Sequence, residues 1–518
     1  MFKIIYINTR SLTIELNNNS CYYSPNDYNF YVNDKLIYKN YNKNILSLFD
    51  LEPDTTYSLK YEDLKTNQIY IEKVTTKKEF VSLNVKKFGA KGDGISNDTN
   101  FIQAAILACP NDSRVYIPKG TYLVGPLFLK SNITIEIAKD AILLGDTNRY
   151  NYPILPGIIE STDEKDEYNL GTWEGNPLDM FATIITGINV ENVNIIGQGI
   201  INGNANNSDW WNNHHTKILA WRPRGIFLNN CKNINIQGIT VTNTPAWNLH
   251  PYFSENIRFL DLNIISPADS PNTDGCDPES CNNIDIIGIN FSVGDDCIAI
   301  KAGKIYMGRK YKRPSENFNI RNCFMNKGHG AVVLGSEMSG GIRNIKVSQC
   351  LFNETDRGLR IKTRRGRGKN AIIDGILFEN IIMDNVLVPI AINMFYFCDP
   401  DGKTEYVYTR EKLPVDDRTP YLGKFHFKDL EIKNVKSCCA SIHGLPEKKV
   451  KEVIFENINF TVAEEGQDFA PVMMTGQDKV KKRAFIFENI EKVIFKNVKV
   501  VGYDKQLIEQ LNVDKIEE

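Results

Sequence analysis

The sequence predicts an all-β protein, a right-handed parallel β-helix preceded by a small β-sandwich. Three observations support this fold class. A short strand motif repeats along most of the chain, the first 78 residues have a different strand pattern, and only one segment has a clear helical pattern. Together they assign most of the chain to one solenoid and the remainder to an appended domain.

Residues 1–78 contain short apolar runs, such as SLTIEL, YNFYV and TTYSLKY, separated by turns rich in Asn and Asp. This pattern is typical of a β-sandwich. The segment LEPDTTY, which ends at Tyr57, resembles the tyrosine corner of fibronectin type III domains. The resemblance leaves two roles open for this domain: presentation or docking of a substrate, or a structural appendage without a ligand of its own.

Residues 83–505 repeat one outline, in which an Asn is followed by two spaced apolar residues, a corner and a second short strand. Copies such as NVNIIGQGIING and NIDIIGINFSVG recur at intervals of roughly 20 to 35 residues, a period typical of solenoids. Strands this short bury a continuous core only when coils stack. We expect Ile, Val and Phe to point inward and the recurrent Asn to form internal ladders at the corners. Residues 506–518 are expected as a C-terminal tail.

One segment, residues 98–109 (DTNFIQAAILAC), predicts a helix with Asp98 or Thr99 at its N-cap. We expect it to cover the N-terminal end of the stack, where strand edges would otherwise be unpaired. Residues 150–180 and 399–422 interrupt the repeat. They are interpreted as insertions that wall off one end of a groove on the β-helix.

Composition and charge narrow the classes of partner. A hydrophobic fraction of 42% and a formal net charge of −2 fit a soluble globular protein and give no global field for nucleic acid. No apolar run approaches the roughly 18 residues that span a bilayer, so we expect no membrane partner. The start of the chain shows no signal-peptide pattern, and the 11 cysteines have no metal or redox spacing. The expected location is the cytoplasm.

Three aspartates are the candidate catalytic residues. Asp274 lies in SPNTDGCDPES, and Asp295 and Asp296 lie in GDDCIAIK, about one coil further on. Residues one coil apart stack in a solenoid, so these carboxylates should converge on one lateral face, with His329 of GHG on the next coil. One carboxyl group could then protonate a leaving oxygen while the others activate water. Each residue alone fits a turn equally well, and it is their combination that favours a glycosidase.

A basic run follows, which begins with Arg360 and Lys362 in RIK. These two side chains share one face of a strand. The run has no aromatic stacking platform of the kind that single-stranded nucleic acid requires, so we expect no nucleic-acid partner. Cationic subsites for an acidic sugar explain it better.

The motifs NTDG, GDD, GHG and RIK, in this order, resemble those of the polygalacturonase family of glycoside hydrolases, as does the opening VKKFGAKGDGISNDTNFIQAAI. The resemblance covers about residues 83–505. It implies hydrolysis of α-1,4-galacturonosyl linkages with inversion, which fits carboxyl groups about 6.5–9.5 Å apart. It also implies that neither a metal nor another cofactor is needed.

The resemblance also implies a role for each motif residue. Asp295 would be the general acid, Asp274 and Asp296 would hold and deprotonate the attacking water, and His329 would sustain the protonation state of the acid. Arg360 and Lys362 would grip a galacturonate carboxylate. Substrate contacts are further expected from Asn272, Trp247 and Tyr396, although the Trp side chains fit loop packing equally well.

Insertions at a groove end imply, through the same resemblance, exo-cleavage from the non-reducing end of oligogalacturonides. Two enzymatic alternatives are an endo-polygalacturonase and a hydrolase of rhamnogalacturonan. An alternative of another class is a non-catalytic β-helix that binds acidic glycans, which the three clustered aspartates disfavour. The motif set argues against a pectate lyase, which would need calcium carboxylates and an Arg base. The sequence predicts no particular oligomeric state.

Overall fold

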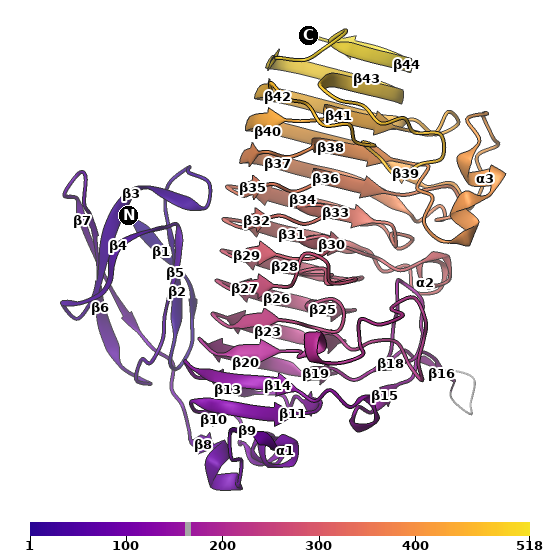
Figure 1. Cartoon of the computed structure of the whole chain (residues 1–518). Coiled ribbons are helices and arrows are strands. Elements are labelled where there is room, and N and C mark those ends of the chain that lie inside the picture. Colours follow the sequence, from indigo (N-terminus) through magenta and orange to yellow (C-terminus); the bar gives the residue numbers. More distant parts are fainter. Residues whose placement is uncertain (161–166) are drawn as a thin grey trace.

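The computed structural model describes residues 1–160 and 167–518. It shows a tall stack of parallel coils with a small sandwich docked on one side (Figure 1). The chain rises from helix α1 (Thr99–Ala108) at the bottom of the stack to the last strands at the top. The predicted all-β fold class, a parallel β-helix preceded by a β-sandwich, is confirmed.

The sandwich consists of two antiparallel sheets that enclose their own hydrophobic core. One sheet contains β1 (Phe2–Ile7), β2 (Leu12–Leu16) and β5 (Ile45–Leu48), and the other contains β3 (Tyr23–Val32), β4 (Lys35–Lys43), β6 (Thr56–Asp63) and β7 (Ile69–Thr75). The hydroxyl of Tyr57 accepts a hydrogen bond of 2.7 Å from the backbone N–H of Glu52. A tyrosine corner makes this kind of bond to the backbone a few residues upstream.

Most strands of the β-helix lie on three lateral faces. The first face contains β8 (Ser82–Asn84), β10 (Ser113–Ile117), β13 (Ile133–Ile137), β20 (Glu191–Gly197), β23 (Lys232–Gln237), β26 (Glu255–Leu260), β28 (Asn282–Ile287), β31 (Ser315–Arg321), β34 (Ile342–Ser348), β37 (Ile372–Asp384), β40 (Lys424–Val435) and β42 (Val450–Val462). The second contains β9 (Asp93–Asn97), β11 (Gly120–Val124), β14 (Ala141–Gly145), β21 (Ile200–Asn202), β24 (Thr240–Thr242), β27 (Asn263–Ile265), β29 (Asn290–Ser292), β32 (Phe324–Asn326) and β35 (Leu351–Asn353). The later strands of the first face are long enough to turn the corner and continue the second.

The third face carries the candidate site and is called the groove face below. It contains β12 (Leu127–Phe128), β19 (Ile185–Ile188), β22 (Ile226–Asn229), β25 (Leu249–Tyr252), β30 (Ile298–Ile300), β33 (Val332–Gly335), β36 (Arg357–Lys362), β38 (Val388–Asn393), β41 (Cys438–His443) and the first part of β43 (Arg483–Val501). Its strands pair in parallel and in register, so that Val332 faces Leu359, which in turn faces Ile390. Alternate side chains therefore point into the core and out to the groove.

Strand periodicity explains the core. Ile234, Ile257, Ile284 and Phe318 occupy equivalent positions on successive coils and are buried. Asparagines also stack, as expected, but on the outside of a corner: Asn233 donates to Asn192, and Asn256 donates to Asn233, each at 3.0 Å. The expectation of internal ladders is therefore wrong for this corner. The asparagines there adopt the left-handed conformation, which turns the chain and leaves the amide at the surface.

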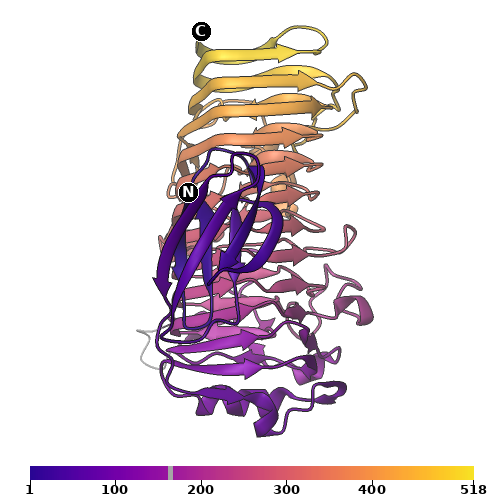
Figure 2. The same cartoon turned by 90° about the vertical axis from the view of Figure 1, so that its left-hand side faces the viewer.

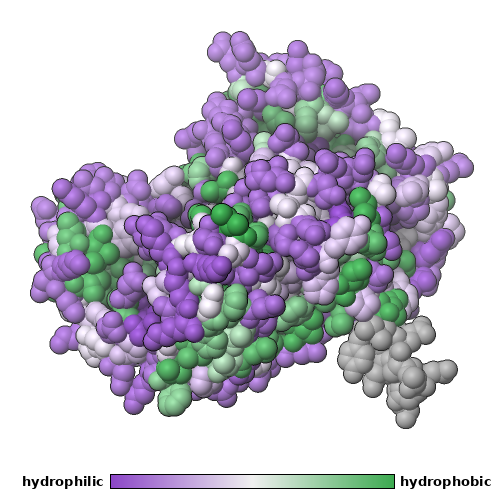
Figure 3. Space-filling view, turned by 60° about the horizontal axis from the view of Figure 1, so that its bottom comes forward, coloured by the Kyte–Doolittle hydropathy of each residue, from purple (hydrophilic) through white to green (hydrophobic). Residues whose placement is uncertain are grey.

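The ends of the stack differ from each other. Helix α1 begins after Asp98, the expected N-cap position, and packs beneath β12. Residues 506–518, expected as a tail, contain β44 (Ile508–Glu517), which pairs in parallel with β43 and adds a last strand to the stack. Seen from the bottom, the surface is a mosaic of hydrophilic and hydrophobic patches (Figure 3). Within the described residues, no helix has the length and apolar character that a membrane crossing requires.

The remaining short elements lie mainly in the connections. The 3₁₀ helices are η1 (Val85–Phe88), η2 (Arg149–Asn151), η3 (Ala205–Asn207) and η4 (Pro400–Lys403), and the short α-helices are α2 (Ile305–Lys310) and α3 (Glu405–Tyr408). The first predicted insertion contains β15 (Ile154–Leu155), β16 (Ile159–Glu160), β17 (Glu167–Tyr168) and the start of β18 (Met180–Phe181), and the second ends in β39 (Tyr421–Leu422). Residues 161–166 of the first insertion lie outside the described residues.

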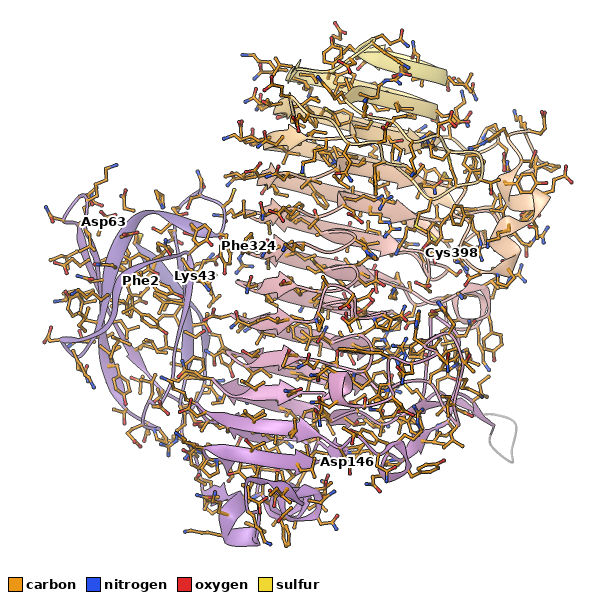
Figure 4. The ribbon with its side chains drawn as sticks, viewed as in Figure 1. Phe2, Lys43, Asp63, Asp146, Phe324 and Cys398 are labelled. Carbon is orange, nitrogen blue, oxygen red and sulfur yellow. The ribbon has the colours of Figure 1, made fainter. Side chains whose placement is uncertain are left out.

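The sandwich contacts the β-helix through a polar and aromatic junction. Ser11 and Thr13 bond to Gln237, and Arg321 makes a charge-assisted bond of 2.7 Å to Glu15. In Figure 4, Lys43 of the sandwich and Phe324 of the β-helix lie on the two sides of this junction. At Gly238, in the left-handed region, a Cβ atom would approach a ring carbon of Phe49 to 2.2 Å. Glycine therefore allows the close contact between the two domains.

All 11 cysteines are free thiols, and all except Cys398 are buried. Cys398 lies beside the second insertion, on the right of Figure 4. The buried cysteines thus act as small apolar residues of the interior.

Candidate active site

Three aspartates meet at the start of the groove-face strands. Asp274 comes two residues before Cys276, Asp296 comes two residues before Ile298, and Cys276 pairs in parallel with Ile298. One carboxylate oxygen from each of Asp274, Asp295 and Asp296 lies within 4.8 Å of the other two. The stack thus brings together residues that the sequence places on successive coils.

The three carboxylates lie close together. One oxygen of each lies within 4.8 Å of the other two, which is a nearest-atom distance, so the expected gap of about 6.5–9.5 Å between whole carboxyl groups stays a prediction. Asp274 and Asp296 stand at one register of neighbouring strands, which are about 4.7–4.9 Å apart, and this brings their side chains together. At this distance two carboxylates can share one water while the third remains available to protonate a leaving group.

Asp296 is held ionised by two cations. Its carboxylate accepts bonds of 3.1 Å from Arg360 Nη1 and 2.8 Å from Lys362 Nζ, and all three side chains are buried. Burial alone would raise the pKa of Asp296, but the charges of Lys362 and Arg360 outweigh burial and hold that pKa below its usual range. Asp296 therefore has the protonation state of a base.

Asp274 tends toward the opposite protonation state. Burial, together with the negative charges of Asp277 and Asp295, raises the pKa of Asp274 well above its usual range. Carboxylates this close share their protons, so the cluster retains a proton near neutral pH. Asp274 is thus the member of the cluster whose raised pKa favours the protonated form, whereas Asp295 is the most exposed of the three carboxyl groups, at 26% of its side chain. A glycosidic oxygen could reach Asp295 most easily.

His329 contacts the exposed aspartate. Its Nδ1 lies 3.3 Å from Asp295 Oδ1, and its backbone N–H donates to the Asp295 carbonyl at 3.0 Å. The hydrogen bond to Asp295 raises the pKa of His329, against the effect of its partial burial. His329 therefore lies where its predicted role as the partner of the acid requires it, and that role stays a prediction.

Removal of Lys362 should shift the pH–rate profile. In Lys362→Ala the Asp296 carboxylate loses its 2.8 Å partner, so its pKa should rise. A base with a depressed pKa is ionised above that pKa and is lost as the pH falls through it. The acidic limb of kcat against pH should therefore move to higher pH. Lys346→Ala, which removes an exposed lysine paired with Glu379, should leave this limb in place; an identical shift in both variants would contradict the pairing.

The other predicted substrate residues are tied into the site by their neighbours. Asn272 accepts a bond of 2.5 Å from Arg222, and the buried Trp247 stacks in parallel with Trp173 at 6.2 Å. Tyr396 is nearly buried, with Lys362 Nζ 5.8 Å from its ring centre. All three border the cluster or its cations, and their contact with substrate remains a prediction.

The tryptophans upstream of the three aspartates belong to two separate groups in the structure. Trp247 and Trp221 belong to one stack, in which Trp173 lies 4.6 Å from Trp221 with nearly parallel rings. Trp210 lies in a separate buried cluster, with Trp211 packed against it. Trp173, from the first insertion, was missing from the sequence-based prediction, because nothing in its local sequence links it to a strand of the groove face.

Four buried charged residues beside the aspartates also escaped the sequence-based prediction. Lys301 Nζ lies 3.5 Å from Asp277 and 3.3 Å from Glu337. Burial raises the pKa of Asp277 to about 7 and that of Glu279 to about 8. Asp277 and Glu279 lie two residues apart in the segment that follows Asp274. Because residues two apart in a strand point to the same side, this spacing could have identified both as outward-facing groove residues.

Both insertions contact the segment around Lys304. The backbone N–H of Lys304 donates to the carbonyl of Gly175 in the first insertion at 2.8 Å, and its side chain pairs with Asp399 of the second at 3.2 Å. Arg224 lies between the first insertion and the groove face, 4.6 Å from the rings of both Trp173 and Trp247. The insertions thus form a joined wall beside the groove.

The basic run after Lys362 is internally neutralised. Arg364 pairs with Asp399 and Asp401, Arg365 pairs with Glu447, and Arg367 lies 3.6 Å from Asp399. All three arginines are buried. Their charges hold the second insertion against the β-helix and are not displayed on a nucleic-acid-binding surface.

No metal was predicted. The three clustered carboxylate oxygens are close enough to be ligands of one cation. Arg360 and Lys362 already neutralise Asp296, the most strongly ionised of them. The protein's own cations therefore balance the charge of Asp296, and the expectation that no metal is needed stays a prediction.

Comparison with known proteins places these features in a family. The model of the glycosyl hydrolases family 28 matches residues 110–465. An exo-poly-alpha-D-galacturonosidase of Dickeya chrysanthemi is 28% identical over 68% of this chain and 61% of its own length. An endo-polygalacturonase of Pectobacterium parmentieri is 30% identical over 71% of this chain and 85% of its own length.

The fold is similar over the whole chain to one solved structure, the family 28 exopolygalacturonase of Yersinia enterocolitica. The TM-score is 0.72 at 19% identity, and the alignment covers 100% of this chain and 98% of that one. The family model spans most of the β-helix, including all three aspartates and the cations that pair with Asp296. This chain belongs to family 28 of the glycosyl hydrolases.

Proposed function

We propose that this glycoside hydrolase is a polygalacturonase that cleaves α-1,4-galacturonosyl linkages. The observation that carries the proposal is the cluster of three carboxylates with two buried cations, Arg360 and Lys362, on one side. Such a site can protonate a glycosidic oxygen, activate water and attract an acidic sugar. The names of the two relatives support this substrate class.

In the proposed mechanism each aspartate has one role. Asp295, the exposed carboxyl group beside His329, protonates the leaving oxygen with a proton drawn from the cluster. Asp296 and Asp274 hold the water, and ionised Asp296 accepts its proton during attack on the anomeric carbon. A substrate carboxylate near Lys362 and Arg360 would add negative charge and so favour the protonated acid. Direct attack by water inverts the anomeric centre.

We also propose that cleavage is exo, from the non-reducing end. The joined wall of the two insertions and the stacked Trp173 support this mode, because they occupy space beside the groove that an uninterrupted chain would need. The alternative, endo-cleavage, is supported by the Pectobacterium relative. A cytoplasmic location is proposed on the 11 free thiols alone and can be tested by cell fractionation.

Time-resolved digestion distinguishes the two modes. The wild-type protein should release one small product from polygalacturonate at the earliest times, with a slow fall in viscosity. The first product should be the β-anomer, visible by NMR before mutarotation. Trp173→Ala should open the wall and add longer products, whereas Tyr150→Ala, exposed at 80% in the same insertion, should not.

Three other outcomes would count against specific parts of the proposal. An early ladder of oligomers from the wild-type protein would contradict the exo mode and leave the substrate class intact. Retention of the anomeric configuration would contradict the direct attack of water. Absence of any hydrolysis of polygalacturonate, combined with activity on rhamnogalacturonan, would reassign the substrate.

A further inference from the structure

A second pocket lies on the side of the β-helix where the groove-face strands end. Its volume is about 410 Å³, and its walls include Tyr252, Phe253, Tyr311 and Arg313. It is called the side pocket below. Trp247 and Asp274 stand at the same register, because Leu249 pairs with Cys276, and Tyr252 is five residues further along its strand. At about 3.3 Å per residue, the side pocket is roughly 16 Å from the three aspartates.

Three aromatic rings form one wall of the side pocket. The ring of Phe253 lies 4.7 Å from that of Tyr252 and 5.3 Å from that of Tyr311, both edge-on. Tyr252 is buried, whereas Phe253 is partly exposed. Edge-on packing supports the Phe253 ring from both sides and leaves it as a rigid apolar surface, the usual wall of a small-molecule site.

Phe253 lies at a corner of the coil where the backbone conformation favours asparagine. The preceding coils have Asn189 and Asn230 at this corner, with φ of 53° and 51°, and Phe253 has φ of 51°. Ladder pairing confirms the equivalence, since Ile188 faces Asn229 and Asn229 faces Tyr252. The left-handed conformation is readily adopted by asparagine and strained for a bulky aromatic residue. The strain makes Phe253 a poor choice for the fold and points to a role for its ring.

Polar groups complete the side pocket. The guanidinium of Arg313 lies 5.3 Å from the Phe253 ring centre. Glu255 pairs with Lys232 at 2.7 Å; this bond is the main cause that lowers the pKa of Glu255, and the charge of Arg313 adds to it. The buried Tyr252 hydroxyl lies beside Thr172, whereas the side-chain carbonyl oxygen of Asn169 has no hydrogen-bond partner among the described residues. Within the part of the chain that the structure describes, a cation without a carboxylate partner and one unpaired polar atom thus lie beside the aromatic surface.

We propose that the side pocket is a second, non-catalytic binding site for a uronate-containing oligosaccharide. Arg313 would pair with the sugar carboxylate, the Phe253 ring would cover an apolar sugar face, and the exposed amides of Asn189 and Asn230 would bond to hydroxyl groups. An adjoining pocket of about 450 Å³ shares Asn189, Asn230, Phe253 and Arg313, which gives room for more than one sugar unit. The ligand's identity as galacturonate rests on the proposed function, whereas the existence of an acidic-sugar site does not.

Calorimetric titration with trigalacturonate tests this site. In an Asp295→Asn background, which prevents turnover, two molecules of trigalacturonate should bind per chain. Adding Phe253→Asn, which restores the corner residue of the preceding coils, should reduce this number to one and should not lower the melting temperature. Arg313→Gln should weaken the same site at least about tenfold, the loss of one charge-assisted contact. Leu219→Asn, at another exposed left-handed position, is the matched control and should leave both sites.

Each other outcome has a defined meaning. One binding event that is unaffected by Phe253→Asn, or two events that persist in both variants, would overturn the proposal. Equal binding of a neutral galactose oligomer at the second site would overturn its assignment to uronates. In an otherwise wild-type chain, Phe253→Asn and Arg313→Gln should hydrolyse trigalacturonate within about twofold of the parent rate. Failure of the wild-type protein to hydrolyse any galacturonate would overturn the proposed function. The second binding site would still be supported if its binding were lost in Phe253→Asn.

Discussion

Replacement of Asp295 by Asn is expected to lower turnover on oligogalacturonate by at least about 10²-fold, the usual contribution of general acid catalysis. An amide keeps the shape of the side chain and its contact with His329 but has no acidic proton for the leaving oxygen. Substrate affinity should largely survive, because Arg360 and Lys362 pair with Asp296 and not with Asp295. Steady-state kinetics on defined oligomers, with Kd measured separately, would separate the two effects.

Asp269→Asn is the matched control, since Asp269 is an exposed aspartate in the loop just before Asp274. It should retain wild-type turnover. Activity of Asp295→Asn within a few-fold of wild type would refute the role of Asp295 as the acid. Asp274, which holds a proton most readily, would then be the next candidate.

The second large effect is expected on stability. Arg365 and Glu447 are both 1% exposed and form a bidentate pair with distances of 2.6 and 2.9 Å. Arg365 also donates to the carbonyl of Thr409 at 2.8 Å, which ties the second insertion to the β-helix. Arg365→Ala leaves Glu447 buried without its partner and should lower the free energy of unfolding by about 3–5 kcal/mol. Denaturant unfolding, followed by tryptophan fluorescence and circular dichroism, would measure it.

Two further variants test which contacts of Arg365 cause the loss of stability. Arg418→Ala removes an exposed arginine whose partner Asp416 lies at 3.6 Å, and should cost less than about 1 kcal/mol. The double variant Arg365→Met, Glu447→Leu replaces both charges by apolar groups and should recover much of the loss. Equal destabilisation by the single and double variants would show that the carbonyl contacts of Arg365, and not its pairing with Glu447, hold the insertion.

The architecture could be predicted from the sequence, because strands with a period of two that recur at coil-length intervals are compatible with few folds. The convergence of Asp274 with Asp296 follows from the same repeat. Pairing between Lys362 and Asp296 could not be predicted, because it depends on which outward positions of separate coils share a register. Trp173 and Glu337 reach the site from a loop and a strand end, where the repeat carries no information.

The docked sandwich has a consequence for how the coils unfold. In a solenoid each coil contacts only its neighbours, so unfolding can begin at an end and spread coil by coil. Here one domain touches several coils at once (Figure 2), from Asn194 through Gln237 and Arg321 to Asn380. Loss of any one of these coils would strain the contacts of the others, so this segment should open as a single block. The sandwich thus braces the coils from Asn194 to Asn380 against separate unfolding.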